Sequence, residues 1–324
     1  MANRLLLSRI LAALLAFWVL FLEICSAGEL LGAFVMPHGG IALDPRYFNT
    51  TNSTAKAEAW ALHEACQQVG REIAALEPSV ILLSTPHGVA DLSNFQFYLN
   101  PRGYGWADTD NCDCPPCCYN VSAEIDGPLS LRIIESLLQK WPGANVSGLA
   151  AYGPPAQEDA EPFPLRWGEV IPLHFILPHS PLTRVMVLSQ PSRRYNDSVA
   201  MIPELLQLGH DLQSYIKSET TERVVVVISA DLAHTHLSSG PYGYSNASEP
   251  FDLAVGEWVK GVNGTALLET AAVLVDRALS CGYTGLVMLH GVLQAVGLSS
   301  WVPRLYANYH PSYYGMMVAS FLPK

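Results

Sequence analysis

The sequence predicts an α/β domain with a mainly parallel central sheet flanked by helices. Short apolar, β-branched runs alternate with longer segments of helical periodicity along the chain. One such run, residues 224–228, is bounded by polar residues on both sides, which is typical of a buried central strand. Half of the 324 residues are hydrophobic, so the chain can bury one large core. We therefore expect a single globular domain.

Three of the expected strands end in loops that carry histidine. Carboxyl ends of parallel strands are where α/β sheets meet their ligands, so the loops should lie together. A lone histidine at a strand end is more often a structural residue, but the grouping favours a metal or proton-transfer site. The runs and their loop residues are 31–36 with His38, 80–83 with His87, and 224–228 with Asp231, His234 and His236.

The remaining elements follow from periodicity and from turn residues. Residues 91–126 lack a long apolar period and mix aromatic residues with glycine and cysteine, which predicts a long structured loop over the site. The expected helices are 56–76, 129–138, 202–216, 266–279 and 285–296, and the further strands are 184–189, 301–307 and 313–322.

Residues 1–27 have the three-part form of a secretory signal peptide. Arg4 and Arg9 precede and flank an apolar run that ends near Leu22, and small residues follow at Ser26 and Ala27. The run is short for a membrane span, so we expect cleavage and no stable membrane insertion afterwards. An uncleaved anchor is the alternative. The predicted mature domain covers residues 28–324.

Asparagine sequons and net charge point to the same compartment. Seven Asn-x-Ser/Thr triplets together with a leader favour a secreted or lumenal glycoprotein. The net charge of −11 argues against nucleic acid as a partner. The sequons begin at Asn49, Asn52, Asn120, Asn145, Asn196, Asn246 and Asn263.

Four cysteines crowd into an insert at about residues 108–120. In an oxidising compartment we expect Cys112, Cys114, Cys117 and Cys118 to form two local disulfides, for which three pairings are open. A zinc site is the alternative, although no second ligand pair lies nearby in the sequence. Cys66 and Cys281 remain. They either pair or stay free, and the place of Cys66 on the apolar face of helix 56–76 favours a buried thiol.

The loops at His38 and His87 suit metal binding. Each histidine follows proline and precedes glycine, which fixes the chain and leaves the backbone open beside an imidazole. Two neutral imidazoles and one anionic ligand make a facial set for a divalent first-row metal. An imidazole at His234 would titrate near neutrality and suits an acid/base role.

The order of these motifs resembles a known enzyme family. Pro-His-Gly at 37–39 and at 86–88, Trp-Gly followed by Pro-Leu within 167–173, and Ser-Ala-Asp-Leu-Ala-His at 229–234 resemble the class III extradiol ring-cleavage dioxygenases, the LigB superfamily. The resemblance spans nearly the whole chain after the leader. Residues 281–285 look more like the Memo branch of that superfamily, in which cysteine stands where the ring-cleaving enzymes have glutamate.

The resemblance implies a doubly wound α/β domain that holds non-haem Fe(II). It implies His38, His87 and Cys281 as the metal ligands and His234 as the acid/base residue. Asp231 would orient His234 or its loop, although a role as a turn or helix cap is as well founded.

Two departures from the family pattern bear on activity. Arg166-Trp167-Gly168 stands where the dioxygenases commonly have Asp-His-Gly, so a second catalytic imidazole is missing. His174, expected on the same strand, is either its substitute or a core residue. The thiolate of Cys281 is softer than a carboxylate and favours copper(I) or zinc. Glu269 is a nearby carboxylate, but its helical neighbours indicate a solvated face.

Two functions are therefore expected from this sequence. The first is ring cleavage of a small catechol- or aminophenol-type aromatic by a metal-dependent extradiol dioxygenase, and the aromatic residues at 95–106 hint at a planar substrate. The second is a Memo-like secreted protein that uses the same pocket for metal binding or redox chemistry without ring cleavage. A homodimer is compatible with either function.

Overall fold

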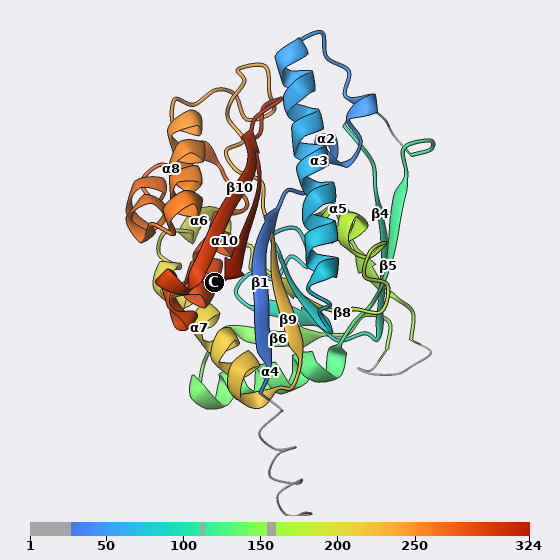
Figure 1. The fold of residues 1–324 in the computed structure, drawn as a ribbon, viewed down its shortest axis with the longest axis vertical. Coiled ribbons are helices and arrows are strands. Elements are labelled where there is room, and N and C mark those ends of the chain that lie inside the picture. Colours follow the sequence, from blue (N-terminus) through green and yellow to red (C-terminus); the bar gives the residue numbers. More distant parts are fainter. Residues whose placement is uncertain (1–26, 111, 113, 154–159) are drawn as a thin grey trace, which may run out of the picture.

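An eight-stranded sheet forms the centre of the molecule in the computed structural model, which describes residues 27–110, 112, 114–153 and 160–324 (Figure 1). The predicted leader falls almost wholly outside these residues. The strand order is β10 (Trp301–Tyr309), β11 (Met316–Pro323), β1 (Glu29–Met36), β9 (Arg223–Ser229), β2 (Val80–Thr85), β8 (Arg184–Ser189), β3 (Phe95–Tyr98) and β6 (Val146–Leu149).

Helices lie on both faces of this sheet, and a small second sheet lies beside it. The small sheet has the order β5 (Tyr119–Glu124), β4 (Arg102–Ala107) and β7 (Phe163–Leu165). The α-helices are α2 (Gly40–Leu43), α3 (Ser53–Ala75), α4 (Gly127–Lys140), α5 (Trp167–Ile176), α6 (Arg194–Asp197), α7 (Ile202–Glu219), α8 (Ser248–Gly261), α9 (Val275–Ala278) and α10 (Tyr283–Val296). Short 3-10 helices cover Pro45–Tyr47 and Leu298–Ser300, and a π-helix covers Ala266–Ala271. None of the described helices is long and apolar enough to cross a membrane.

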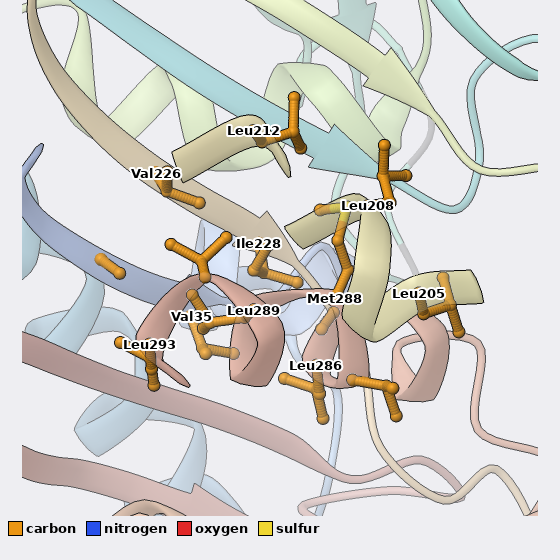
Figure 2. Close-up of a cluster of buried hydrophobic side chains, with 14 of the residues drawn as sticks. Val35, Leu205, Leu208, Leu212, Val226, Ile228, Leu286, Met288, Leu289 and Leu293 are labelled. Carbon is orange, nitrogen blue, oxygen red and sulfur yellow. The ribbon is translucent and has the colours of Figure 1, made fainter. Parts of the chain in front are cut away.

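The two faces of the sheet build two separate hydrophobic cores. Successive strand residues point to opposite faces, so Val226 and Ile228 of β9 pack on one side while Val225 and Val227 pack on the other. Figure 2 shows the first core, where Ile228 and its neighbours meet the apolar side chains of α7 and α10. Helices α3 and α5 cover the second core, and α3 runs in front of the sheet in Figure 1. The predicted α/β domain with a mainly parallel, helix-flanked sheet is confirmed.

The topology places three parallel strands side by side in the order β1, β9, β2. Chain order would put β9 far from β1, because β2 and β8 come between them in the sequence. Each pair is parallel, with Met36 opposite Ser229 and Ser84 opposite Ile228. The three carboxyl ends therefore share one edge of the sheet, which is the arrangement that the strand-end histidines required.

The segment 91–126 is not the long loop that the sequence predicted. It contains β3, β4 and β5, and β3 pairs with β8 at one side and β6 at the other. Glycine misled the prediction, because Gly105 serves packing and not a turn. A Cβ atom at Gly105 would clash with the backbone of Leu165 on the neighbouring strand β7.

The segment around His174 is helix α5 and not a strand, so that prediction is wrong. The run Val170-Ile171 reads as β-branched, but Glu169 accepts a hydrogen bond from the Arg166 backbone N–H at 3.0 Å and caps the helix. The predicted helix at 266–279 is also interrupted, since the π-helix turns there give way to α9. Helix α8 had no counterpart in the prediction.

Candidate metal centre

The loops after β1, β2 and β9 bring their polar residues to one point. His38, His87 and Asp231 each stand two residues beyond the last residue of their strand. His38 and Asp231 are buried, and His87 is partly buried. The strand geometry therefore sets the spacing of this cluster, as the sequence predicted.

One nitrogen of His38, one nitrogen of His87 and the sulfur of Cys281 lie within 4.8 Å of one another. The Cys281 Sγ is 3.3 Å from His38 Nε2, and the two imidazole centroids are 4.7 Å apart. No hydrogen bond occupies the ring nitrogens of His87 in the described part of the chain. The three residues proposed as ligands are thus brought together, although their role as ligands stays a prediction.

The hydrogen bonds around His38 determine which ring nitrogen carries the proton and which keeps a lone pair. Ser229 donates its hydroxyl proton to the Gly168 carbonyl at 2.6 Å, so it can only accept from His38 Nδ1, which lies 2.8 Å away. His38 therefore carries its proton on Nδ1 and keeps a lone pair on Nε2, the nitrogen beside Cys281. Burial, followed by the neighbouring His87, holds the pKa of His38 well below its usual range.

Cys281 reaches the cluster from the start of helix α10. Gly282 makes this possible, because a Cβ atom there would stand 2.5 Å from Ala230 Cβ, and its N–H donates to the Asp231 carbonyl at 3.1 Å. Cys281 and Cys66 are both free and buried, so the alternative of a disulfide between them is wrong. Burial raises the pKa of the Cys281 thiol to about 12, and Asp231 adds to the rise. Arg194 only partly offsets this rise, so without a metal ion the sulfur is a neutral thiol.

Asp231 organises the His38 loop. Its Oδ1 accepts from the His38 backbone N–H at 3.0 Å, and its Oδ2 lies 3.3 Å from His38 Nε2. Burial raises its pKa to about 8. No hydrogen bond links Asp231 to His234 among the described residues, so of the two orienting roles expected for Asp231 the geometry favours the one on the loop.

His234 faces the same pocket in a tautomer suited to a base. Its Nδ1 donates to the Leu232 carbonyl at 2.9 Å, which leaves the Nε2 lone pair free. Its ring stacks on Tyr314 with centroids 5.8 Å apart. Burial lowers its pKa, so the imidazole is neutral at physiological pH and ready to accept a proton.

A cavity of about 290 Å³ opens over these residues. Its aromatic walls are Trp167, Tyr242, Tyr313 and Tyr314, and the Trp167 ring lies 5.0 Å from that of His87. Tyr314 donates to Asp110 Oδ2 at 3.1 Å, which joins the cysteine-rich segment to the pocket. Sequence reasoning missed the three tyrosines. A Tyr-Tyr pair between the last two strands was the available signal.

The aromatic residues that suggested a planar substrate lie elsewhere. Phe95 and Phe97 are buried in β3, whereas Tyr104 and Trp106 are exposed on the outer face of β4. They do not line the cavity over the histidines. The aromatic residues that could contact a planar ligand are therefore Trp167 and the three tyrosines.

A second opening reaches the cluster from the side of Cys281. It is lined by His87, His234 and Arg194 among others. The Arg194 side chain is buried and donates to the Pro86 carbonyl at 2.5 Å, but its Nε has no partner and no carboxylate pairs with it among the described residues. This buried cation also helps to lower the pKa of His87 and of His234. Arg194 gave no motif in the sequence.

His174 and His236 do not join the pocket. His174 lies farther along α5, where its ring contacts those of Tyr119 and Phe175, and burial lowers its pKa. The geometry therefore does not support His174 as the substitute for a missing catalytic imidazole. His236 instead bonds Asp252 at 2.8 Å.

The cysteine-rich insert contains two disulfides, Cys112 to Cys117 and Cys114 to Cys118. Local disulfides were expected, and this pairing is one of the three that were open. Asp108 and Asp110, at the start of the insert, line the cavity. The insert therefore closes a segment that contributes to the pocket wall, and the zinc alternative for these cysteines is not supported.

The donor set fits a divalent metal ion. Ligands that stand about 2.0–2.3 Å from one cation lie roughly 3–4.5 Å apart, which is the spacing required of two imidazoles and one thiolate. The nitrogens of His38 and His87 and the sulfur of Cys281 lie within 4.8 Å of one another, and the 3.3 Å between Cys281 Sγ and His38 Nε2 falls inside that range. A bound cation would also lower the pKa of the buried thiol and stabilise its ionised form.

Comparison with known proteins gives one family. The family model for the catalytic LigB subunit of aromatic ring-opening dioxygenase matches residues 32–319. A curated protein of Clostridium acetobutylicum is 23% identical over 260 residues, which cover 80% of this chain and 50% of that protein. The chain thus spans about half the length of that relative. The crystal structure of an uncharacterized Escherichia coli protein superposes with a TM-score of 0.51 and 15% identity, covering 90% of this chain and 99% of the other.

Proposed function

Because the chain belongs to the LigB family of aromatic ring-opening dioxygenase catalytic subunits, we propose that it cleaves the ring of a small catechol- or aminophenol-type aromatic. One observation carries the proposal. His234, whose Nε2 lone pair is free, lines one pocket with His38 and His87, and Cys281 joins His87 and His234 in the lining of the second opening. An acid/base imidazole beside a ligand cluster is the constellation that metal-assisted oxygen chemistry needs.

His38, His87 and Cys281 would hold the metal in this proposal, and Fe(II) is the preferred ion, with copper and zinc as alternatives. When bound, Fe(II) would supply Lewis-acid binding of substrate oxygens and redox chemistry toward dioxygen. The two-imidazole part of the set suits Fe(II), whereas the sulfur of Cys281 shifts the preference toward softer ions. Metal analysis of the purified protein is therefore part of the test.

The residues of the chain then bind, orient and deprotonate the substrate. Trp167 and Tyr314 line the pocket, and aromatic side chains of this kind can pack against a planar ring. A hydroxyl of the substrate that reaches His234 Nε2 would transfer its proton there, since burial keeps this imidazole neutral. The Leu232 carbonyl holds Nδ1–H and favours the protonated ring once it forms.

A second candidate function is Memo-like metal binding or redox chemistry without ring cleavage. Two observations favour it. Trp167 lies against His87 where the ring-cleaving relatives carry a catalytic imidazole, and a thiol takes the place of the carboxylate ligand. This function uses the same cluster and requires no aromatic substrate.

Oxygen uptake separates the two functions. Protein loaded with Fe(II) without air is supplied with oxygen and a panel of catechols and aminophenols. Ring cleavage predicts uptake stoichiometric with substrate, and His234→Gln should slow it by about 10²–10⁴-fold at unchanged iron content. Loss of iron in His87→Ala and Cys281→Ser, with no uptake on any substrate, would favour the second function. His210→Ala, an exposed histidine away from the pocket, is the control.

We also propose that the protein enters the secretory pathway. Six of the sequon asparagines are exposed, and the seventh, Asn145, is partly buried with its Nδ2 bonded to Glu204 at 3.0 Å. Exposed sequons accept glycans in the endoplasmic reticulum. Glycosidase treatment of material from a eukaryotic host should lower its apparent mass. An unchanged mass together with cytosolic fractionation would contradict the proposal.

A further inference from the structure

We propose that His236, His310 and Glu249 form a second site for a divalent first-row cation of the zinc type, separate from the His38 cluster. The three residues come from different elements. His236 lies in the loop after β9, Glu249 in the first turn of α8, and His310 in the turn between β10 and β11. Two ring nitrogens and a carboxylate oxygen from this set lie within 4.8 Å of one another.

The His236 ring is fixed by a hydrogen bond to a carboxylate, as metal-binding histidines usually are. Its Nε2 lies 2.8 Å from Asp252 Oδ2, and Asp252 Oδ1 accepts from the Ala233 backbone N–H at 3.0 Å. With Nε2–H donated to a fixed carboxylate, the lone pair is on Nδ1, which has no partner in the described part of the chain. A carboxylate behind a histidine is the usual support of a metal-bound imidazole.

His310 and Glu249 are free to close around an ion. Their side chains are 43% and 60% exposed, and His310 Nε2 lies 3.2 Å from Glu249 Oε2. The His310 ring is stacked on that of His236 with centroids 3.9 Å apart. Rotation of the exposed His310 turns its lone pair toward the shared point.

Two imidazoles and one carboxylate form a ligand set that zinc accepts, with water in the fourth position. A cation here would tie the β10–β11 turn to α8 and to the loop that carries His234. The His236 backbone N–H donates to the Tyr313 carbonyl at 3.1 Å, and Tyr313 lines the pocket. The second site therefore fixes one wall of the pocket without taking part in its chemistry.

Zinc titration of the chelator-treated full chain, followed by calorimetry, tests the site. The wild type should bind two zinc ions. Glu249→Gln keeps a hydrogen-bonding partner for His310 but is a poor ligand, so this variant and His310→Ala should each lose one ion or bind it at least tenfold more weakly. His87→Ala should lose the other ion and keep this one, which separates the second site from the proposed active site.

The exposed His210 again supplies the control, since His210→Ala should bind two ions like the wild type. Circular dichroism and thermal melting show that each variant is folded. Zinc-edge anomalous scattering from soaked crystals should give a peak between His236, His310 and Glu249. Equal zinc binding by the wild type, Glu249→Gln and His310→Ala would overturn the site, and so would a single wild-type ion that His87→Ala abolishes.

Discussion

Glu169 should make the protein less stable as the pH rises from about 5 to 8. Its side chain is fully buried, and burial raises its pKa from 4.5 to about 7 despite hydrogen bonds from Tyr98 and the Arg166 backbone. The folded state therefore holds a proton that the unfolded chain releases above pH 4.5. The stability that this proton contributes is fully present below pH 4.5, and it is lost progressively as the pH rises from there through the folded pKa of about 7.

The size of the effect follows from the shift. Between pH 5 and pH 8, ionising this buried group costs about 2.5 kcal/mol of folding free energy relative to the unfolded chain. Glu169→Gln removes the ionisation but leaves one donor unpaired, at a cost of about 1–3 kcal/mol at every pH. The variant should therefore be less stable than the wild type at pH 5 and close to it, or more stable, at pH 8.

Urea unfolding of both chelator-treated proteins at pH 5, 6, 7 and 8 measures this difference. Subtracting the two curves cancels every other titrating group, including the buried histidines. Glu257→Gln, an exposed change on α8, controls for loss of one carboxylate. A difference between Glu169→Gln and the wild type that stays constant within about 0.5 kcal/mol would refute the linkage reasoning.

Three further predictions concern stability and the cysteines. Arg46→Gln should destabilise the protein at neutral pH, because Arg46 holds the pKa of Asp44 at about 2. This loss of stability should vanish as the pH falls from about 4 to 2 and Asp44 becomes protonated in both proteins. Acid titration of both proteins checks this, and a loss that does not depend on pH would contradict it. Leu289→Ala, in the core of Figure 2, should lower the free energy of unfolding in urea by about 2–5 kcal/mol. Leu182→Ala, at a 95% exposed position, should leave that free energy almost unchanged. Similar losses in the two variants would place Leu289 outside a packed core. Denatured, unreduced protein lacking residues 1–27 should show two reactive thiols, from Cys66 and Cys281. The double variant Cys112→Ser with Cys117→Ser should show the same two thiols, because Cys114 and Cys118 remain paired. Extra thiols in that variant would disprove the pairing.

The positions of His38, His87 and His234 were predictable because strand ends fix them. A buried apolar run followed by Pro-His-Gly leaves little freedom, and parallel strands align their ends. Cys281 was different. No periodicity points to it, and only the resemblance to a family placed it near the pocket.

The pocket walls were beyond sequence reasoning for a physical reason. Tyr313 and Tyr314 reach the site through the β10–β11 turn, and Arg194 through the short helix α6, so their positions depend on how distant elements pack. The prediction for segment 91–126 was wrong for the opposite reason. Its glycines resemble turn residues locally, whereas Gly105 is required by contact with β7.

The sequence distance between His38 and Cys281, 243 residues, has a consequence for how the protein acquires its metal. An unfolded chain cannot hold both donors near one ion, so the cation can be captured only after β1, β9 and α10 have assembled. The cysteines of the insert stand only 5 and 4 residues apart within each pair and can be oxidised before any sheet exists. Metal loading should therefore report completion of the fold. In His310→Ala, which lacks the proposed second site, the gain in unfolding free energy with free metal concentration should follow the dissociation constant of the His38 cluster.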